Sequence, residues 1–453
     1  MFSRRKKTVL TLLCLCSVLY VAVQVMHYQE EFHPLQALST AEQEAQRLLK
    51  FMTSYHYQCN NTLHSSNYSD WSICIEADTG VINVESSVPK IAYSIGPVSD
   101  FSFETILSRN LSFQQYVFLH DTSSTAPPPL LQLNGTTVYR TAIVPNDPAD
   151  FGRNSYNMQT INSIMATLHH RHIDILKLES VQDMSHSYEV LYFMVKDGIL
   201  ARFQQLHISL EIDKVDDNYL YGWYKTLYSL FHSAGFRLYH TAASSPLCLQ
   251  VTMMESCRYF TSWVRNPGPR TFVYYPPAID GSAQYEEQRL EDFLDRPSQL
   301  DEDVIPVKLS PYTTLRLSRR VLMSGSDSCT ILIFQDETSR REVMGLSDII
   351  SHYLFSQSTK VVFLDLRHVT WQFLTPFLDS GALQKVDQLE IMTPMFKVQA
   401  DGRQPAQMMR LQYSELQRIL AYQMALTEAS PLTKDSLRFR SSGDLWRLTF
   451  VKK

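Results

Sequence analysis

The chain has 453 residues, more than one ordinary domain holds, so two or three domains are expected. Hydrophobic residues make up 44% of it and charged residues 19%, a composition that indicates globular protein and excludes a disordered or repetitive chain. The formal net charge of −5 lacks the basic footprint of a nucleic-acid-binding protein, so no nucleic-acid partner is expected.

The first residues predict a membrane anchor. Residues 1–7 form a basic cytoplasmic tail, and residues 8–26 are uncharged and long enough, as a helix, to cross the hydrocarbon core of a bilayer. Because basic flanks stay cytoplasmic, we expect a single-pass type II membrane protein whose bulk is lumenal or extracellular, in the Golgi, the ER or at the cell surface. A cleaved signal peptide is the alternative, but no small-residue cleavage site follows the apolar run.

Sequons and cysteines agree with a secretory compartment. Four sequons, and none later in the chain, predict glycosylation at Asn60, Asn67, Asn110 and Asn134. Two pairs of cysteines are spaced as local disulfide candidates, Cys59 with Cys74 and Cys248 with Cys257, and Cys329 is left over. No Cys-x-x-Cys pair exists, so no metal site is expected.

Residues 27–88 are expected to form a stem and a Cys-bearing lead-in. One helix is predicted there, because Thr40 and Gln43 resemble a capping box and apolar residues follow at helical spacing.

From residue 89 to residue 266, short apolar runs alternate with helical patterns. Strands are expected at Ile91–Ile95, Tyr116–Leu119, Tyr139–Val144, Ile173–Leu178 and Gln205–Leu210, and helices at Met158–Leu168, Tyr188–Val195 and Trp223–Ala234. This alternation predicts an α/β domain with a mostly parallel sheet. Two final strands, Phe236–Tyr239 and Tyr259–Val264, are compatible with antiparallel pairing, and Asn266–Pro269 marks a domain boundary.

Residues 312–453 repeat this α/β pattern after a Pro-rich, acidic stretch, residues 267–311, that is expected to be a linker with some local order. Asp197–Ile208 aligns without a gap with Ser380–Ile391, and five of the twelve positions are identical. Further matches in the same order pair Ile173–Glu179 with Val361–Arg367, Met158–Leu168 with Met344–Leu354, and Phe236–Val264 with Leu437–Val451. We therefore expect a duplication whose second copy is a degenerate half-domain.

The first unit resembles a known family. Ile91–Glu104 reads I-A-Y-S-I-G-P-V-S-D-F-S-F-E and resembles V-Y-S-F-G-x-G-x-D-x-S-F-E, the opening motif of the type 22 methyltransferase domain. That methyltransferase-like family is related to FkbM-like enzymes and is often membrane-anchored or secreted. Ile173–Glu179 resembles its I-D-x-L-K-x-D-x-E-G-x-E motif, and the likeness covers about residues 55 to 266.

The resemblance implies a Rossmann-like fold that binds S-adenosylmethionine (SAM) at the carboxyl ends of the first strands. Gly96 would let the backbone approach the cofactor, and Asp121, after the second strand, would accept the ribose hydroxyl hydrogens. Methyl transfer mainly needs alignment of acceptor and methyl group, and Glu179 is the candidate catalytic base if the acceptor loses a proton. The methyl acceptor is not indicated.

Departures from the family pattern leave other functions open. Val98, preceded by Pro97, replaces the second glycine of the opening motif, and the motif after the fourth strand is altered beyond Glu179. A non-catalytic lumenal binding or scaffold protein on the same fold is therefore the alternative. A type II glycosyltransferase ranks last, because its metal-binding carboxylates would be Asp301 and Asp303, within the expected linker.

Simpler interpretations exist for several of these residues. Gly96 could end a strand, Asp121 could cap a turn, and Lys177 with Glu179 could form an ion pair at the edge of the sheet. Histidines after the helix expected at Met158–Leu168 suit a helix carboxyl terminus better than a metal site: His169, His170 and His172. His207 alternates within a buried strand and is expected to be a core histidine.

Overall fold

The computed structural model describes most of the chain from residue 34 onward. The described residues are 34–64, 71–76, 89–96, 101–119, 133–145, 158–179, 187–212, 216–243, 257–268, 273–297, 304–308, 314–319, 329–335, 359–366, 374–379, 381–395, 405–432 and 445–453. The expected anchor, residues 8–26, lies outside these ranges. Within them, no helix combines the length and the apolar character needed to cross a membrane.

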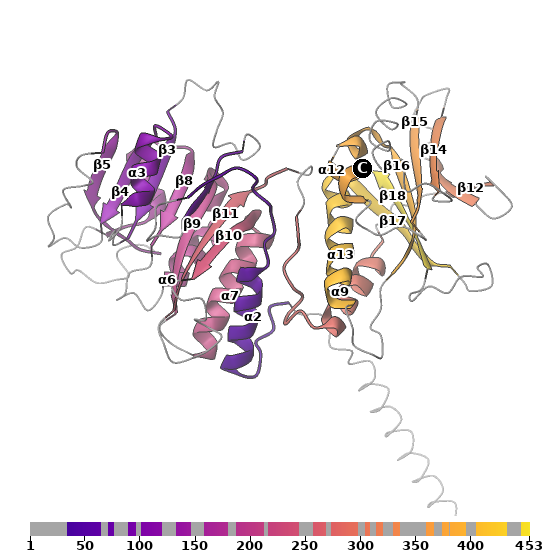
Figure 1. Ribbon diagram of the computed structural model, residues 1–453, viewed down its shortest axis with the longest axis horizontal. Helices are drawn as coiled ribbons and strands as arrows, with labels where there is room; N and C mark the ends of the chain where they lie inside the picture. Colours follow the sequence, from indigo (N-terminus) through magenta and orange to yellow (C-terminus); the bar gives the residue numbers. More distant parts are fainter. Residues whose placement is uncertain are drawn as a thin grey trace, which may run out of the picture. The chain divides into compact units, whose positions relative to one another are not determined.

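A seven-stranded sheet forms the centre of the first α/β unit (Figure 1). Its strands in spatial order are β10 (Phe236–Ala243), β11 (Cys257–Arg265), β9 (Phe203–Ile212), β8 (Ile173–Leu178), β3 (Ile91–Ile95), β4 (Gln114–Leu119) and β5 (Thr136–Arg140). All neighbours pair in parallel except β11, which is antiparallel to both β9 and β10. The predicted α/β class and mostly parallel sheet are confirmed.

The strand order defines a topological switch point. Numbered in chain order, these seven strands lie in the spatial order third, second, first, fourth, fifth, seventh, sixth. This is the 3-2-1-4-5-6 order of a Rossmann sheet with a seventh, antiparallel strand inserted between the fifth and the sixth. The sheet is therefore consistent with a Rossmann-like methyltransferase fold. Its switch point lies between the carboxyl ends of β3 and β8, because the chain leaves β3 toward β4 and later enters β8 on the other side.

Helices and a hairpin cover the two faces of this sheet. On one face, α3 (Ser102–Arg109) and the hairpin of β1 (Thr62–His64) and β2 (Ser72–Cys74) bury Trp71, Ile73 and Phe103 against Ile175. The remaining elements of the unit are α2 (Ala41–Thr53), β6 (Ala142–Ile143), β7 (Met158–Gln159), α5 (Ile161–Thr167), α6 (Ser187–Lys196), η3 (Ile199–Arg202) and α7 (Asp217–His232). Helix α5 begins later than expected, since Thr160 caps it and Met158–Gln159 pairs with β6.

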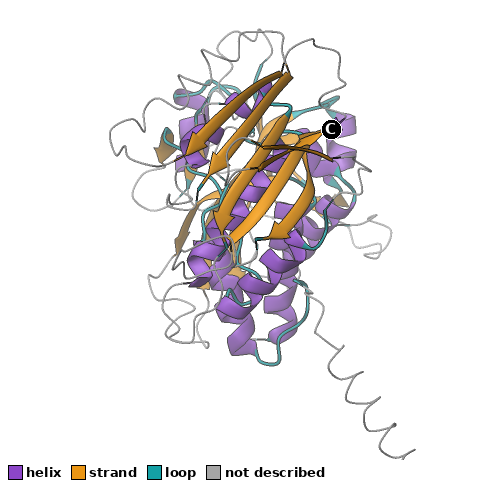
Figure 2. Ribbon diagram, turned by 90° about the vertical axis from the view of Figure 1, so that its right-hand side faces the viewer, coloured by secondary structure: helices purple, strands orange, loops and turns teal. Residues whose placement is uncertain are grey.

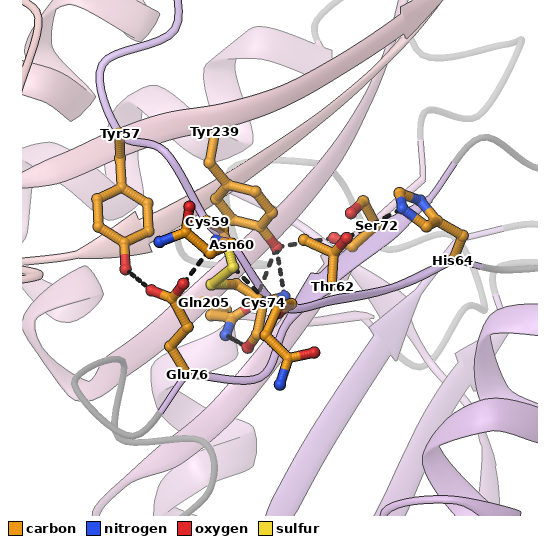
Figure 3. Close-up of a disulfide and its surroundings, with 11 residues drawn as sticks. Tyr57, Cys59, Asn60, Thr62, His64, Ser72, Cys74, Glu76, Gln205 and Tyr239 are labelled. Carbon is orange, nitrogen blue, oxygen red and sulfur yellow. Dashed lines mark hydrogen bonds between the residues drawn. A yellow bond between two sulfur atoms is a disulfide. The ribbon is translucent and has the colours of Figure 1, made fainter.

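A disulfide between Cys59 and Cys74 ties the hairpin to the segment that follows α2 (Figure 3). Cys74 is fully buried, and its N–H donates to the side-chain oxygen of Gln205 and to the Tyr239 hydroxyl, at 3.2 and 3.1 Å. The Gln205 amide donates in turn to the Cys74 carbonyl. The structure thus contains the first candidate disulfide, whereas Cys248 of the second candidate pair lies outside the described residues.

We expect replacement of both Cys59 and Cys74 by alanine to lower the free energy of unfolding by about 3 kcal/mol. The bridge closes a loop with a sequence separation of 15, and a crosslink of that length restricts the unfolded chain by about this amount. Urea unfolding of both proteins, followed by circular dichroism without reductant, measures the difference. An unchanged midpoint, or a digest of the wild type without the linked peptide, would contradict the expectation.

A five-stranded sheet forms the second unit (Figures 1 and 2). In spatial order its strands are β14 (Cys329–Gln335), β15 (Thr359–Asp365), β16 (Gln388–Pro394), β18 (Leu445–Lys452) and β17 (Met424–Pro431). The first three are parallel, and β18 is antiparallel to both of its neighbours. This is the order of the first, fourth, fifth, seventh and sixth strands of the first sheet. The described residues therefore contain a partial second copy without counterparts of β4 and β5.

The second sheet is covered like the first. One face packs against α9 (Ala283–Leu294), α12 (Leu374–Asp379) and α13 (Pro405–Ala421), and the short helix η5 (Ala382–Lys385) precedes β16. The hairpin of β12 (Val304–Lys308) and β13 (Thr314–Ser318) places Leu317 on the opposite face, against Val361 and Phe363.

Equivalent contacts in the two units extend the repeat beyond the sheets. Helices α2 and α9 align without a gap and share Ala41/Ala283, Glu44/Glu286, Gln46/Gln288, Arg47/Arg289, Leu48/Leu290 and Phe51/Phe293. In each helix the buried glutamate and arginine form an ion pair. The arginine also lies over a tyrosine ring of the partner helix, Arg47 at 4.1 Å from Tyr224 and Arg289 at 4.3 Å from Tyr413.

A glutamine holds the hairpin in both units. Gln388 accepts a hydrogen bond from the Ser318 N–H and donates to the Arg316 carbonyl, as Gln205 does with both backbone groups of Cys74. Each repeat therefore comprises a helix, a hairpin and the sheet that follows them.

Two expectations about the repeat are corrected. The stretch expected to be a linker, residues 267–311, contains α9, which packs against α13, so the second repeat begins at this helix and not at residue 312. The alignment of the two repeats is also shifted by two residues from the expected one. Val361 lies opposite Gln388 in the second sheet, and the residue opposite the equivalent Gln205 in the first sheet is Ile175, not Ile173. The proposed counterpart of α5, Met344–Leu354, lies outside the described residues.

Candidate cofactor site at the carboxyl edge of the first sheet

The carboxyl ends of β3, β4, β8 and β9 meet at one edge of the first sheet, which is where open α/β sheets bind ligands. The structure describes these strand ends but not the segments that follow them, residues 97–100, 120–132, 180–186 and 213–215. Asp121 therefore lies outside the described residues. The strand that precedes Asp121, β4, pairs in parallel with β3 and places Phe118 opposite Ile95. Both strands therefore end at the same edge of the sheet.

Gly96 lies at the switch point in a conformation that favours glycine, with φ of +120°. Its N–H donates to the Phe118 carbonyl at 3.2 Å. A Cβ at this position would lie only 2.3 Å from the carbonyl oxygen of Glu179. The space that the missing side chain opens is thus filled by the backbone at the end of β8, and tight strand packing accounts for the glycine.

Glu179, the predicted base, directly follows β8 beside Gly96, and its side chain is only 7% exposed. One carboxylate oxygen lies 3.3 Å from Lys177 Nζ, and the other lies 3.8 Å from a guanidinium nitrogen of Arg258. Burial raises the pKa of Glu179 above its ordinary value, the Lys177 ammonium opposes this, and the Glu104 carboxylate adds to it. The net shift is upward, which makes Glu179 a stronger proton acceptor than an exposed glutamate.

Glu104 and Lys177 form a buried ion pair beneath Glu179. Lys177 Nζ lies 3.0 Å from Glu104 Oε1, and the Ser94 hydroxyl donates to the same oxygen. Burial lowers the pKa of Lys177, but the two carboxylates outweigh burial and raise it overall, so the ammonium stays charged. The expected edge pair of Lys177 with Glu179 is therefore part of a larger buried cluster.

Sequence reasoning missed Glu104 and Arg258 as members of this cluster. Glu104 lies in the first turn of α3, where an acidic residue is favourable for any helix. The available signal was its position between Phe103 and Leu107, which places the carboxylate on the buried side. Arg258, in β11, is brought to the edge by antiparallel pairing with Glu211 of β9, to which it also donates a hydrogen bond at 3.3 Å.

The structure confirms His207 as a core histidine and places His169 and His170 directly after α5. His207 is fully buried, its Nδ1 lies 3.1 Å from the Ser262 hydroxyl, and burial lowers its pKa to about 3, so it stays neutral. His170 Nδ1 lies 2.8 Å from the Tyr93 hydroxyl. Within the described ranges, a metal-like grouping occurs only at Cys59, Cys74 and Glu76, where the two sulfurs already form the disulfide.

The sequons are exposed where the structure describes them. Asn60, Asn110 and Asn134 are all accessible to solvent, and Asn67 lies outside the described residues. The Ser108 hydroxyl donates to the Asn134 carbonyl, so this sequon adjoins the carboxyl-terminal end of α3.

A cavity of about 330 Å³ lies between α5 and α6, but none of the predicted site residues lines it. Its walls combine Ile161, Val190 and Met194 with Asn162, Asp197 and Arg202. Asn162 accepts a hydrogen bond from Arg202 at 3.4 Å, so the polar groups on this wall are already partly satisfied.

Comparisons with known proteins give no family assignment. No family model matches the chain, and no curated protein matches it. Among solved structures, phosphoethanolamine N-methyltransferase 1 of Haemonchus contortus, in complex with phosphoethanolamine and S-adenosylhomocysteine, is 8% identical and has a TM-score of 0.22. The match covers 83% of this chain and 91% of that chain. A likeness this weak supports no conclusion about the activity of the chain.

Proposed function

We propose that the first α/β unit is a SAM-binding, methyltransferase-like domain of a secretory-pathway protein anchored by residues 8–26. The observation that carries this proposal is the position of Glu179, a carboxylate of raised pKa at the switch point of the seven-stranded sheet. One of its oxygens, Oε2, is buried 3.3 Å from the Lys177 ammonium, and the other, Oε1, lies 3.8 Å from Arg258.

SAM, when bound, would supply the methyl group. Asp121 would hold the ribose hydroxyls, and Glu179 would take a proton from an acceptor that must lose one. The cations on either side of Glu179, Lys177 and Arg258, would keep its carboxylate oriented toward the edge of the sheet. Gly96 contributes by allowing β3 and β8 to end in close contact.

A secretory location accounts for features away from the site. The Cys59–Cys74 disulfide requires an oxidising compartment, and Asn60, Asn110 and Asn134 are exposed as glycan acceptors must be. The membrane is the partner that the anchor implies, and the methyl acceptor would be a glycan, a lipid or a small molecule of that compartment.

Isothermal titration of SAM into the full chain in detergent tests the proposal. We expect saturable binding, and at least a tenfold loss of affinity in Asp121→Ala, because the ribose hydroxyls would lose a charged acceptor. Asp301→Ala is the matched control and should bind SAM like the wild type. Absence of SAM binding together with manganese-dependent UDP binding lost in Asp301→Ala would replace the proposal with the glycosyltransferase alternative.

A second candidate function is non-catalytic binding or scaffolding on the same fold. It is favoured by the two cations that already engage Glu179 and by the backbone that fills the space beside Gly96. SAM binding without transfer of its labelled methyl group to components of secretory membranes would support this candidate.

A further inference from the structure

A hollow with a basic lining lies at the amino edge of the first sheet, opposite the candidate cofactor site. Its volume is about 600 Å³, a size that suits a small molecule. The residues that line it all belong to the described part of the chain: Met165, Ala166, His169, His170, Arg171 and Arg202. The first two are apolar, the other four carry basic side chains, and none of the six is acidic.

Parallel pairing at the start of two strands brings the arginines together. Ile173, the first residue of β8, lies opposite Phe203, the first residue of β9. Arg171 lies just before β8, and Arg202 lies immediately before β9. Two guanidinium groups from different segments therefore reach the same end of neighbouring strands and line one hollow.

The turn after α5 adds two imidazoles to the lining. The His169 N–H donates to the Ala166 carbonyl at 3.2 Å, and the His170 N–H donates to the Met165 carbonyl at 2.9 Å. These are the two hydrogen bonds of a Schellman motif, in which glycine usually takes the position of His169 because φ there is positive. His169 has a φ of +57°, so a side chain is kept where glycine would be less strained.

His170 is held by the sheet and provides a neutral donor. Its Nδ1 lies 2.8 Å from the hydroxyl of Tyr93, which is buried in β3. Burial raises the pKa of Tyr93 and lowers the pKa of His170, so the hydroxyl keeps its proton and the imidazole is neutral at pH 7. Within the described residues this hydroxyl has no other acceptor, so it donates to Nδ1, and the imidazole carries its own proton on Nε2.

The two arginines lack anionic partners within the described ranges. Neither forms an ion pair there, and Arg202 donates only to the neutral amide of Asn162, at 3.4 Å. Asp174, the acid closest in sequence to Arg171, accepts a hydrogen bond of 2.8 Å from the first residue of β3 instead. The lining thus holds two guanidinium charges and no carboxylate.

We propose that this hollow binds the phosphate group of a small phosphate monoester. Guanidinium groups present paired N–H donors that match phosphate oxygens, and a phosphate monoester carries about −1.5 to −2 charge at pH 7, which two arginines balance. The Nε2–H of His170 is a further donor, and Met165 and Ala166 provide apolar surface for the organic part of the ester. This site is independent of SAM, whose proposed site lies at the opposite edge of the sheet.

Isothermal titration of inorganic phosphate and of glucose 6-phosphate into the full chain in detergent tests the site. We expect saturable binding of both, weakened about tenfold in Arg171→Gln and in Arg202→Gln, because each substitution removes charge-assisted hydrogen bonds. Both side chains are exposed, so the variants should unfold at the same urea concentration as the wild type. Arg109→Gln is the matched control: it removes an exposed arginine from the end of another helix, α3, and should bind like the wild type.

Glucose 6-sulfate, a monoanion of similar shape, tests the charge class of the ligand. The phosphate ester should bind at least about fivefold more tightly, because it carries more charge toward the two guanidinium groups. Equal or tighter binding of the sulfate ester would overturn the proposal, as would equal binding in the two arginine variants and Arg109→Gln, or no binding of either phosphate compound.

A titration of glucose 6-phosphate in the presence of excess SAM separates the two proposed sites. SAM should leave the affinity for the phosphate ester unchanged, and displacement of the ester by SAM would overturn a separate site at the amino edge. If SAM itself does not bind, the proposed function fails, and the effects of Arg171→Gln and Arg202→Gln still decide whether the hollow takes a phosphate group.

Discussion

Gly96→Ala should lower the free energy of unfolding by about 2 to 6 kcal/mol. The alanine would have to adopt a φ of +120°, and its Cβ would lie 2.3 Å from the Glu179 carbonyl oxygen. A side chain in such a backbone region costs about 1 to 3 kcal/mol, and overpacking against a fixed backbone adds about 1 to 3 kcal/mol. Urea unfolding, followed by circular dichroism and extrapolated to water, measures the loss.

Gly198→Ala is the matched control for this substitution. Gly198 also has a positive φ, +66°, but an added Cβ would meet no atom within 4 Å. We expect a loss of only about 1 kcal/mol, the cost of a left-handed conformation for a residue with a side chain. If the two variants were equally destabilised, the contact between Gly96 and the end of β8 would contribute nothing, and the close packing described for the switch point would be wrong.

Lys177→Met should destabilise the protein by about 3 to 5 kcal/mol at pH 7. The side chain is 1% exposed, and its removal leaves Glu104 and Glu179 as two neighbouring buried carboxylates. Breaking a buried pair by removing one partner typically costs about this much, because the remaining charge stays uncompensated. Chemical denaturation at pH 7 measures the effect.

The same variant should recover part of this loss on acidification. Burial already raises the pKa of Glu179 in the wild type, and without the Lys177 ammonium the folded-state pKa rises further. A group whose folded pKa exceeds its unfolded value contributes stability at low pH and loses it as pH rises through the folded pKa. The difference between variant and wild type should therefore be smaller at pH 5 than at pH 7.

Lys196→Met provides the comparison for the pH series. Lys196 is exposed at the end of α6, so its replacement should change stability by less than about 0.5 kcal/mol at both pH values. A Lys177→Met deficit that did not shrink at pH 5 would mean that the two carboxylates are not the cause of the destabilisation.

Local patterns predicted the α/β class of the first unit and several of its strands. The strands Ile91–Ile95 and Ile173–Leu178 have the bounds that their apolar runs predict, and β10 and β11 pair antiparallel as expected. These features depend on side chains that are neighbours in the sequence. A strand that is buried on both faces of a parallel sheet appears in the sequence as an unbroken apolar run.

Helix α9 shows where local patterns failed. Its buried side includes Glu286 and Arg289, which pair with each other, and Glu286 also pairs with Arg410 of α13. Read without its partner helix, the segment is simply acidic and follows several prolines, so it resembles a linker. The equivalent Glu44 and Arg47 in α2 form the same pair, and the ungapped alignment of the two helices is the sequence signal that identifies this segment as part of the repeat.

The α/β class, the strands at the switch point and the duplication follow from short apolar runs and ungapped repeats, which are local features of the sequence. The folded arrangement was needed to bring Glu104 to Lys177, 73 residues later in the chain, and the Glu179 backbone into the space beside Gly96. Ion pairs and backbone contacts between distant segments depend on strand order and helix packing, and no local spacing records them.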